Sequence, residues 1–392
     1  MPNVTVCLRY PMSLSNWFQK MVSPDKKPEP VLLPTVDREA QPDDTSMATL
    51  QELSRFVNGG KTSDARSLDE DCTDYALILG NLFRSQGDID RAVRLRETLL
   101  ATPGMMAERK ASIFFELGRD YRKAGFYDRA AAAFREARTL GYAPDYVSQE
   151  LALLAASSGD YERAAAESSH YGNFRAEAYY NVRLAEEYVS IGNDGAAMRL
   201  IKKALTVFPG SPEAWLRLVT INLVNGDASR AFKRLRAGMD RADRAGKVIL
   251  LEGLYAFIKG SAAPHIDKNA LNTMATDFSL FVEERDSEVI LSYYVGLFLQ
   301  AADNEKDAEQ WFTKCLVLDP DFWAARLAIL SLSMRREKLP LLLSQQIDFF
   351  SAQASFAKRF RCDNCGLRHD AIFSVCPRCR AWHSAAFRAR FF

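Results

Sequence analysis

A glycine that recurs at a nearly constant interval is the feature of this sequence that most limits the folds open to it. The interval is roughly 34 residues, the length of one helical repeat unit. An alanine follows each of the first five glycines at the same offset, and a small or modest residue precedes each at another fixed offset. A repeat of this length is one supersecondary unit, so we expect stacked units. The glycines are Gly87, Gly125, Gly159, Gly192, Gly226 and Gly260.

The physical basis of this pattern is a helical hairpin. Glycine supplies the backbone conformation of the turn, and small residues let two antiparallel helices approach closely. The alanines are Ala92, Ala130, Ala164, Ala197 and Ala231, and the residues before the turns are Gly80, Gly118, Ala152, Ala185 and Val219. This is the tetratricopeptide pattern. We therefore predict an all-α fold, a tetratricopeptide-repeat superhelix, over residues 71–350.

The later units are less regular. A further unit is marked by Gly296, Ala308, Phe312 and Pro320, and Trp215 and Trp323 fall at the start of following units. The unit that contains His265 lacks the alanine, so we expect a bend or inserted loop near residues 261–267. After Trp323, a last apolar helix pair that includes Leu341 and Leu342 is expected to cap the stack. Residues 351–355 are expected to form a short joint.

Two Cys-x-x-Cys pairs near the C-terminus predict a metal site. Each pair can turn two sulfurs inward, and two such turns close together in the sequence supply four sulfurs in tetrahedral order. Disulfides are disfavoured because the sequence shows no signal peptide and the other three cysteines are scattered. We predict a four-cysteine metal-binding module at residues 358–385 that holds one iron or zinc ion. Its ligands are Cys362, Cys365, Cys376 and Cys379.

Residues 1–70 differ in composition from the rest of the chain. Residues 1–45 contain seven prolines among charged and small residues, which predicts a flexible leader. Residues 46–70 are expected to form a partial first helix or a degenerate repeat. Residues 13–22 have apolar side chains at helical spacing and could form a short amphipathic helix. Three alternatives remain for this segment: weak contact with a membrane surface, docking on the rest of the chain or on a partner, and disorder. The sequence contains no apolar run of about 18 residues, the length that a membrane-spanning helix needs. Because it also shows no signal-peptide pattern, we expect a cytoplasmic protein.

The basic residues of this nearly neutral chain gather at its C-terminal end. The net charge is +1, but residues 358–392 hold eight Lys and Arg against two Asp, and residues 386–392 form a basic tail. A tetrathiolate around a divalent ion carries a net charge of about −2. Four arginines are placed to offset it: Arg361, Arg368, Arg378 and Arg380. Trp382 and Phe373 are expected to cover the module or pack it on the array.

The concave groove of the first two clear units is the predicted site for a partner. We number each repeat unit so that its turn glycine is position 15. In these two units, the positions of the first helix that face the groove hold an asparagine and three arginines around two apolar side chains. Guanidinium groups pair bidentately with carboxylates, so this groove could clamp an acidic or carboxylate-bearing peptide, and a solvated helix face is the alternative. The residues are Leu77, Asn81, Arg84, Phe115, Arg119 and Arg122.

No catalytic constellation is found, so we expect a protein that is not an enzyme. The four histidines, His170, His265, His369 and His383, accompany no nucleophile motif, and glycine-rich phosphate loops are absent. We expect neither His369 nor His383 to bind the metal, because four cysteines already complete a tetrahedron.

The repeats and cysteines together resemble one known family. Residues 79–92 (LGNLFRSQGDIDRA) and 117–130 (LGRDYRKAGFYDRA), followed by Cys-x-x-Cys-Gly and Cys-Pro-x-Cys-Arg-Ala-Trp, are similar to the lipopolysaccharide assembly protein B (LapB) family. The resemblance covers about residues 71–385. It implies a rubredoxin-like knuckle docked on the array, with the same four cysteines as metal ligands. It also implies a transmembrane helix at the start, which is not found in this sequence.

The resemblance implies a non-enzymatic adaptor that regulates lipopolysaccharide synthesis. Family members work with the FtsH protease to promote turnover of the LpxC deacetylase, and they associate with lipopolysaccharide assembly proteins. Peripheral contact with the cytoplasmic face of the inner membrane is left open. Two alternatives remain: a redox- or metal-sensing interaction protein, and a nucleic-acid-binding zinc-ribbon protein, although no nucleic acid is expected as a partner.

Overall fold

The computed structural model describes residues 70–260, 266–285, 288–336, 340–355 and 357–388. By its contacts the chain divides into two units, Met1–Asp64 and Ala65–Phe392, and the described residues all lie in the second unit. The predicted leader, nearly all of the predicted partial helix at residues 46–70 and the loop at 261–265 lie outside the described residues. Glu70 is the first residue of a helix.

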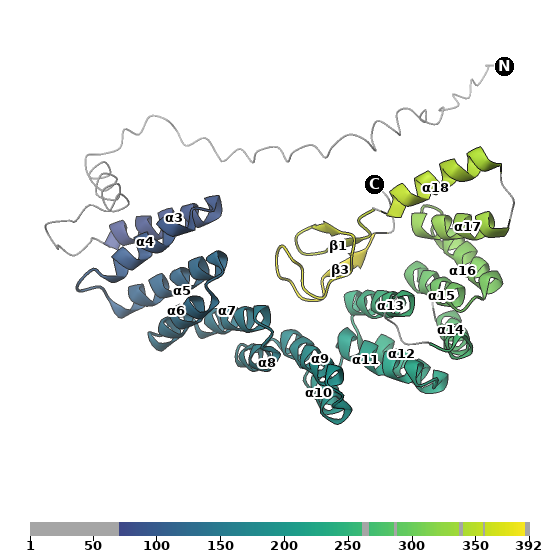
Figure 1. Ribbon diagram of the computed structural model, residues 1–392, viewed down its shortest axis with the longest axis horizontal. Coiled ribbons are helices and arrows are strands. Elements are labelled where there is room, and N and C mark those ends of the chain that lie inside the picture. Colours follow the sequence, from purple (N-terminus) through teal and green to yellow (C-terminus); the bar gives the residue numbers. More distant parts are fainter. Residues whose placement is uncertain (1–69, 261–265, 286–287, 337–339, 356, 389–392) are drawn as a thin grey trace, which may run out of the picture. The chain divides into compact units, whose positions relative to one another are not determined.

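The described part of the chain is built from helices that follow one another in pairs (Figure 1). The first four pairs are α3 (Glu70–Gln86) with α4 (Ile89–Leu100), α5 (Ala107–Ala124) with α6 (Tyr127–Thr139), α7 (Pro144–Ser157) with α8 (Tyr161–His170), and α9 (Phe174–Ser190) with α10 (Asp194–Val207). The next four are α11 (Pro212–Val224) with α12 (Ala228–Arg241), α13 (Arg244–Lys259) with α14 (Lys268–Glu283), α15 (Val289–Ala301) with α16 (Glu305–Leu318), and α17 (Trp323–Arg336) with α18 (Leu341–Ser355). The predicted all-α repeat fold is confirmed.

Five of the six predicted turn glycines have the left-handed backbone that their role requires. Their φ angles lie between +72° and +88°, which side chains with a Cβ adopt only with strain. Gly260 is the exception, with φ −66° at the end of α13. The prediction of a tight turn there was wrong, because α13 and α14 are joined by the longer segment 260–267. That segment lies where the sequence predicted a bend or inserted loop.

Close helix approach explains the small residues that precede the turns. A Cβ placed on Gly118 would lie 2.6 Å from the ring of Phe134, and one on Gly296 would lie 2.5 Å from the ring of Phe312. The alanine after each turn is buried, as Ala130 illustrates with no exposed surface. The hairpins therefore use glycine on one helix to admit a large side chain from the other.

Side-chain caps fix where many of the helices begin. Asp160 and Asn173 accept hydrogen bonds from the backbone N–H groups of Arg163 and Ala176, at the starts of α8 and α9. Asn193, Ser211, Asp227, Asp243, Asp267 and Asn304 do the same for later helices. Each cap satisfies a donor that the first turn of a helix leaves unpaired.

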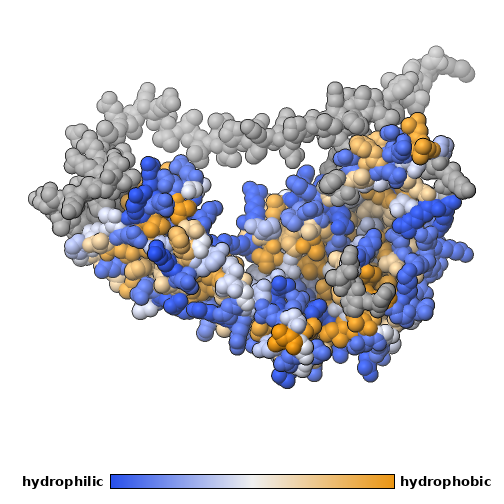
Figure 2. All heavy atoms as spheres, in the orientation of Figure 1, coloured by the Kyte–Doolittle hydropathy of each residue, from blue (hydrophilic) through white to orange (hydrophobic). Residues whose placement is uncertain are grey.

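The last helix pair differs from the predicted cap. Leu341 and Leu342 of α18 are 75% and 70% exposed, so they do not pack on the preceding helix as a cap would require. Figure 2 shows this apolar surface at α18. Residues 351–355, predicted to be a joint, belong to α18 because Ser, Ala and Gln include no helix breaker. In the described part of the chain, no helix is both long and apolar enough to cross a bilayer.

A small antiparallel sheet follows α18, and the four cysteines lie at the end of its first strand and in the segments between its strands. Its strands are β1 (Phe360–Cys362), β2 (Arg368–His369) and β3 (Ala385–Phe387), in the order β2-β1-β3. Phe360 pairs with His369 on one side and with Phe387 on the other. β3 thus extends two residues into the predicted tail. Phe360 and Phe387 belong to the large apolar core of the later repeats, so the module shares a core with the array.

Candidate metal centre and its contacts with the repeats

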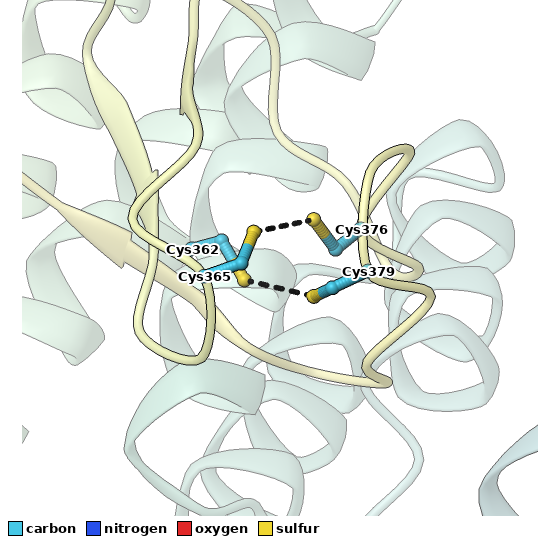
Figure 3. Close-up of side chains that lie close together, drawn as sticks. All are labelled: Cys362, Cys365, Cys376 and Cys379. Carbon is cyan, nitrogen blue, oxygen red and sulfur yellow. Dashed lines mark hydrogen bonds between the residues drawn. The ribbon is translucent and has the colours of Figure 1, made fainter. Parts of the chain in front are cut away.

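The sulfur atoms of Cys362, Cys365, Cys376 and Cys379 all lie within 4.8 Å of one another (Figure 3). The Sγ atoms of Cys362 and Cys379 are 3.7 Å apart, and those of Cys365 and Cys376 are 3.6 Å apart. A disulfide needs a separation of about 2.05 Å. Four sulfurs at about 2.3 Å from one tetrahedral ion are about 3.8 Å apart. The spacing therefore fits a single metal ion.

Two matching turns aim these sulfurs inward. Cys362 N donates to Leu367 O at 2.8 Å and Gly366 N donates to Cys362 O at 2.9 Å. In the second turn Cys376 N donates to Ala381 O and Arg380 N donates to Cys376 O, both at 2.9 Å. Gly366 (φ +72°) and Arg380 (φ +59°) occupy the same left-handed position of the two turns. The second turn thus carries an arginine where the first has glycine.

The surroundings of Cys379 favour its thiolate form. The pKa of this thiol is lowered to about 6, chiefly because Asn364 Nδ2 donates a hydrogen bond to its sulfur at 3.4 Å. Thiolates are the form that binds metal. Four cysteine ligands leave no open coordination position, so an ion held here would play a structural part.

Aromatic side chains join the module to the middle of the array. The ring of Trp382 meets Tyr179 and Tyr180 of α9 edge-on, at centroid distances of 5.3 and 5.9 Å. Phe387 contacts Tyr293 of α15 at 5.8 Å. Phe373 is half-buried against the same core. The predicted packing role of Trp382 and Phe373 is confirmed.

A buried polar pair lies at the same interface. His383 Nε2 is 3.0 Å from Oε1 of Glu213, near the start of α11, and the imidazole stacks on Phe208. The His383 side chain is 1% exposed and that of Glu213 is 12% exposed. Burial acts to raise the pKa of Glu213, but the hydrogen bond and charge of His383, together with hydrogen bonds from Ser374 and the backbone, lower it overall. His369 is elsewhere, with Nδ1 2.9 Å from Ala371 O.

Two further contacts extend the interface to the last helices. Arg359 forms an ion pair with Glu252 of α13 at 3.0 Å, and Tyr294 donates to the same carboxylate at 2.8 Å. Trp323 Nε1, at the start of α17, donates to Arg388 O at 3.0 Å. The module therefore contacts helices that are far apart in the sequence.

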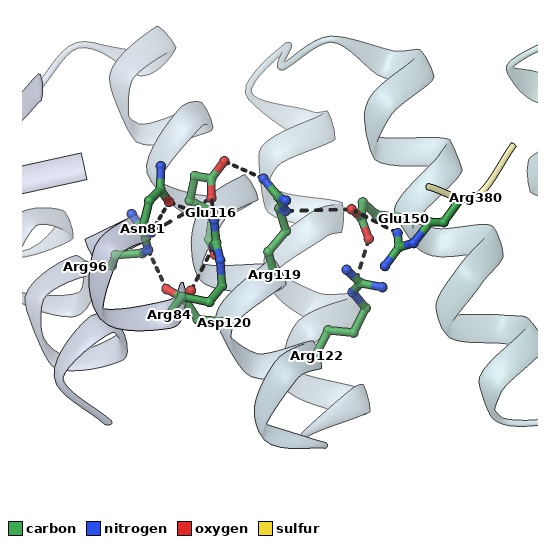
Figure 4. A network of polar contacts seen from close by, with 9 residues as sticks. All are labelled: Asn81, Arg84, Arg96, Glu116, Arg119, Asp120, Arg122, Glu150 and Arg380. Carbon is green, nitrogen blue, oxygen red and sulfur yellow. Dashed lines mark hydrogen bonds and ion pairs between the residues drawn. The ribbon is translucent and has the colours of Figure 1, made fainter. Parts of the chain in front are cut away.

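The polar residues predicted for the groove on α3 and α5 belong to a network of ion pairs and hydrogen bonds (Figure 4). Arg84 pairs with Glu116 at 2.7 Å and Asp120 at 2.9 Å. Buried Arg96 of α4 also pairs with Asp120, and both arginines donate to Asn81 Oδ1. The guanidinium of Arg84 is therefore already bound to carboxylates of the chain itself.

The two apolar groove residues differ in their environment. Phe115 is 7% exposed and stacks on Tyr142 at 4.5 Å, so it is a core residue, whereas Leu77 is half-buried. Partner binding by these residues and by the arginines of the groove stays a prediction.

A second part of the network joins the groove to the metal module. Glu150 of α7 lies 3.8 Å from Arg119, 3.2 Å from Arg122 and 3.8 Å from Arg380 (Figure 4). Burial lowers the pKa of Arg122; Glu150 opposes this effect, and Arg380, Arg119 and Arg84 add to it. Arg380, predicted to offset the thiolate charge, thus also reaches the array.

The chain is similar in sequence to known repeat proteins. Models of the tetratricopeptide repeat match residues 76–105, 115–170 and 180–221. Lipopolysaccharide assembly protein B of Escherichia coli (strain K12) is 25% identical over 324 residues, which cover 78% of this chain and 78% of that protein. The protein of the same name from Haemophilus influenzae is 26% identical over 329 residues, covering 79% and 77%.

The chain contains tetratricopeptide repeats and resembles lipopolysaccharide assembly protein B. Its resemblance to that family, predicted from the repeats and cysteines, is confirmed. Among solved structures, a tetratricopeptide repeat protein from Parabacteroides merdae is 16% identical with a TM-score of 0.34, covering 67% of this chain and 98% of that one.

Sequence reasoning did not identify Arg96 or the four carboxylates that the structure places at this site. Glu150 and Glu213 lie on helices far from the cysteines in sequence, and Glu116 and Asp120 lie on α5 beside the predicted groove arginines. One signal was available: a carboxylate three or four positions from an arginine on the same helix face predicts a pair, as Glu116 forms with Arg119. The contacts of Glu150 and Glu213 with the module depend on tertiary structure alone.

Proposed function

We propose that this chain is a non-enzymatic adaptor that regulates lipopolysaccharide synthesis by binding partner proteins. The observation that carries the proposal is the similarity to lipopolysaccharide assembly protein B over 78% of both chains. Stacked helical repeats form extended surfaces that bind other proteins. The four-cysteine site supports a structural role for a metal ion, because it has no open ligand position.

The proposal extends to specific partners. By resemblance to its family, the chain would bring an LpxC-type deacetylase to an FtsH-type protease and promote its turnover, and it would associate with lipopolysaccharide assembly proteins. The groove formed by α3, α5 and α7 is the proposed partner surface. We place this activity in the cytoplasm, because thiols stay reduced there, with peripheral contact at the inner membrane.

Depletion of the chain tests the proposal. We expect the half-life of the LpxC-type deacetylase to lengthen, measured by immunoblot after protein synthesis is stopped. The wild-type chain should restore fast turnover, and so should the Arg230→Gln variant, because this side chain is 76% exposed and belongs to α12, which contributes no residue to the network of Figure 4. An unchanged half-life on depletion would contradict the proposed regulatory role.

A further inference from the structure

The polar network of Figure 4 carries more positive charge than it neutralises. It contains five arginines and three carboxylates, an excess of two positive charges. The excess is uneven. Arg84 and Arg96 pair with Glu116 and Asp120, and Arg119 also pairs with Glu116 at 3.2 Å. Around Glu150 there are three arginines, and Arg122 and Arg380 have no closer carboxylate among the residues of Figure 4.

The carboxylate of Glu150 does not satisfy those three arginines. Its Oε2 lies 3.2 Å from Arg122 Nε, yet both atoms are buried and lack a hydrogen bond. Arg119 and Arg380 reach Oε1 only at 3.8 Å. Their side chains remain 39% and 40% exposed, so neither is closed off from solvent.

We propose that Arg119, Arg122 and Arg380 form a composite site for the carboxylate side chains of an acidic protein segment. Two of the arginines come from helix α5, and the third comes from the metal module. The array alone would therefore hold an incomplete site. This inference rests on the proposed adaptor function only in taking the ligand to be a protein.

The surroundings favour a peptide over a bare anion. Tyr146 lies one turn before Glu150 on α7, on the same helix face, and is 63% exposed. A segment that places two carboxylates on the arginines can lay an apolar side chain on this ring. Guanidinium groups bind carboxylates by paired, charge-assisted hydrogen bonds, which favours acidic side chains as the ligand.

Binding of a labelled peptide to the full chain tests the site. The probe is a short fluorescein-labelled peptide of alternating glutamate and leucine, compared with the same peptide carrying glutamine, and the readout is fluorescence anisotropy. We expect the glutamate peptide to bind, and Arg119→Gln and Arg380→Gly each to weaken it about tenfold, the loss expected for one charge-assisted contact. Arg230→Gln should leave binding unchanged.

Two variants separate binding from folding. Arg380→Gly removes the guanidinium from a left-handed position that glycine adopts without strain, so the second cysteine turn should be retained. Glu150→Gln removes the carboxylate that competes with the ligand, so it should strengthen binding about threefold to tenfold. If Glu150 only held the arginines in place, the same substitution would weaken binding.

Several outcomes would overturn the proposed site. They are equal binding of both peptides, unchanged binding by Arg380→Gly, and weaker binding by Glu150→Gln. Binding of a DNA oligonucleotide with the same arginine dependence, without binding of the glutamate peptide, would also overturn it. Peptide binding as expected with unchanged deacetylase turnover would retain the site and reject the proposed function.

Discussion

Individual side chains decide how closely the helices of each hairpin approach. Gly118 and Gly296 stand where a Cβ would lie within 2.6 and 2.5 Å of a phenylalanine ring. Glycine at a helix interior lowers helix stability by about 0.5–1 kcal/mol relative to alanine. Retaining it is favourable only where the packing gained exceeds that loss, as it does with Phe134 and Phe312.

We predict that Gly118→Ala lowers the free energy of unfolding by about 1–3 kcal/mol, because the new methyl group overlaps the ring of Phe134. Urea unfolding followed by circular dichroism measures the change. Gly195→Ala in α10 is the matched control, because the nearest atom to its Cβ would be 3.9 Å away. It should be neutral or stabilising, and equal losses in the two variants would contradict the packing argument.

The buried pair of Glu213 and His383 supports a second prediction. Glu213→Gln should lower the free energy of unfolding by about 1.5–3 kcal/mol at pH 7, because His383 loses a charged hydrogen-bond partner. Glu162→Gln, on an exposed first turn of α8, should change it by less than about 0.5 kcal/mol. Urea unfolding measures both.

The loss of unfolding free energy caused by Glu213→Gln should depend on pH in one direction. Because the pKa of Glu213 is lowered from its ordinary value of 4.5, the pair contributes fully above that pH. Its contribution disappears as the pH falls through the lowered pKa of the folded chain. The difference between wild type and Glu213→Gln should therefore shrink below about pH 4.5. A difference that stays constant down to pH 3 would show that Glu213 does not act through its charge.

At the scale of elements, local patterns predicted the helices well and their contacts poorly. The turn glycines, the buried alanines and the two cysteine turns each depend on residues close in sequence. The position of the four-cysteine module against α9, α11 and α15 does not, because contacts such as Trp382 with Tyr179 depend on how the repeats stack. The prediction that α18 is a buried cap was wrong because apolar periodicity indicates a helix but not which surface covers it.

Part of the candidate site could be predicted from the sequence, and part depends on tertiary contacts. Spacing alone brought the four cysteines together as one group. The groove arginines were identified from repeat positions, but their carboxylate partners on neighbouring repeats were not. Sequence position can assign a residue to the concave face, whereas charge balance on that face depends on three-dimensional neighbours. Arg380 illustrates this limit, because it pairs with Glu150, which belongs to a helix in the first half of the chain.

At the scale of the whole molecule, we expect the groove to depend on the metal site through the contacts of the module. Arg380 directly follows Cys379, and its backbone N–H closes the second cysteine turn. One ion on the four cysteines would link this turn to the first cysteine turn, so we expect the turn to loosen when the ion is removed. The arginine that completes the proposed carboxylate site would then lose its fixed position.

We predict that removing the ion with a chelator weakens binding of the glutamate peptide by about the same factor as Arg380→Gly, about tenfold. The two changes together should weaken binding no further, because each removes the same contact. Fluorescence anisotropy measures the affinities, and the release of metal is followed with a colorimetric indicator. Arg119→Gln is the control for independence, because its loss should add to that caused by the chelator. If the chelator also weakened binding by Arg380→Gly, the ion would shape the groove through contacts other than this arginine.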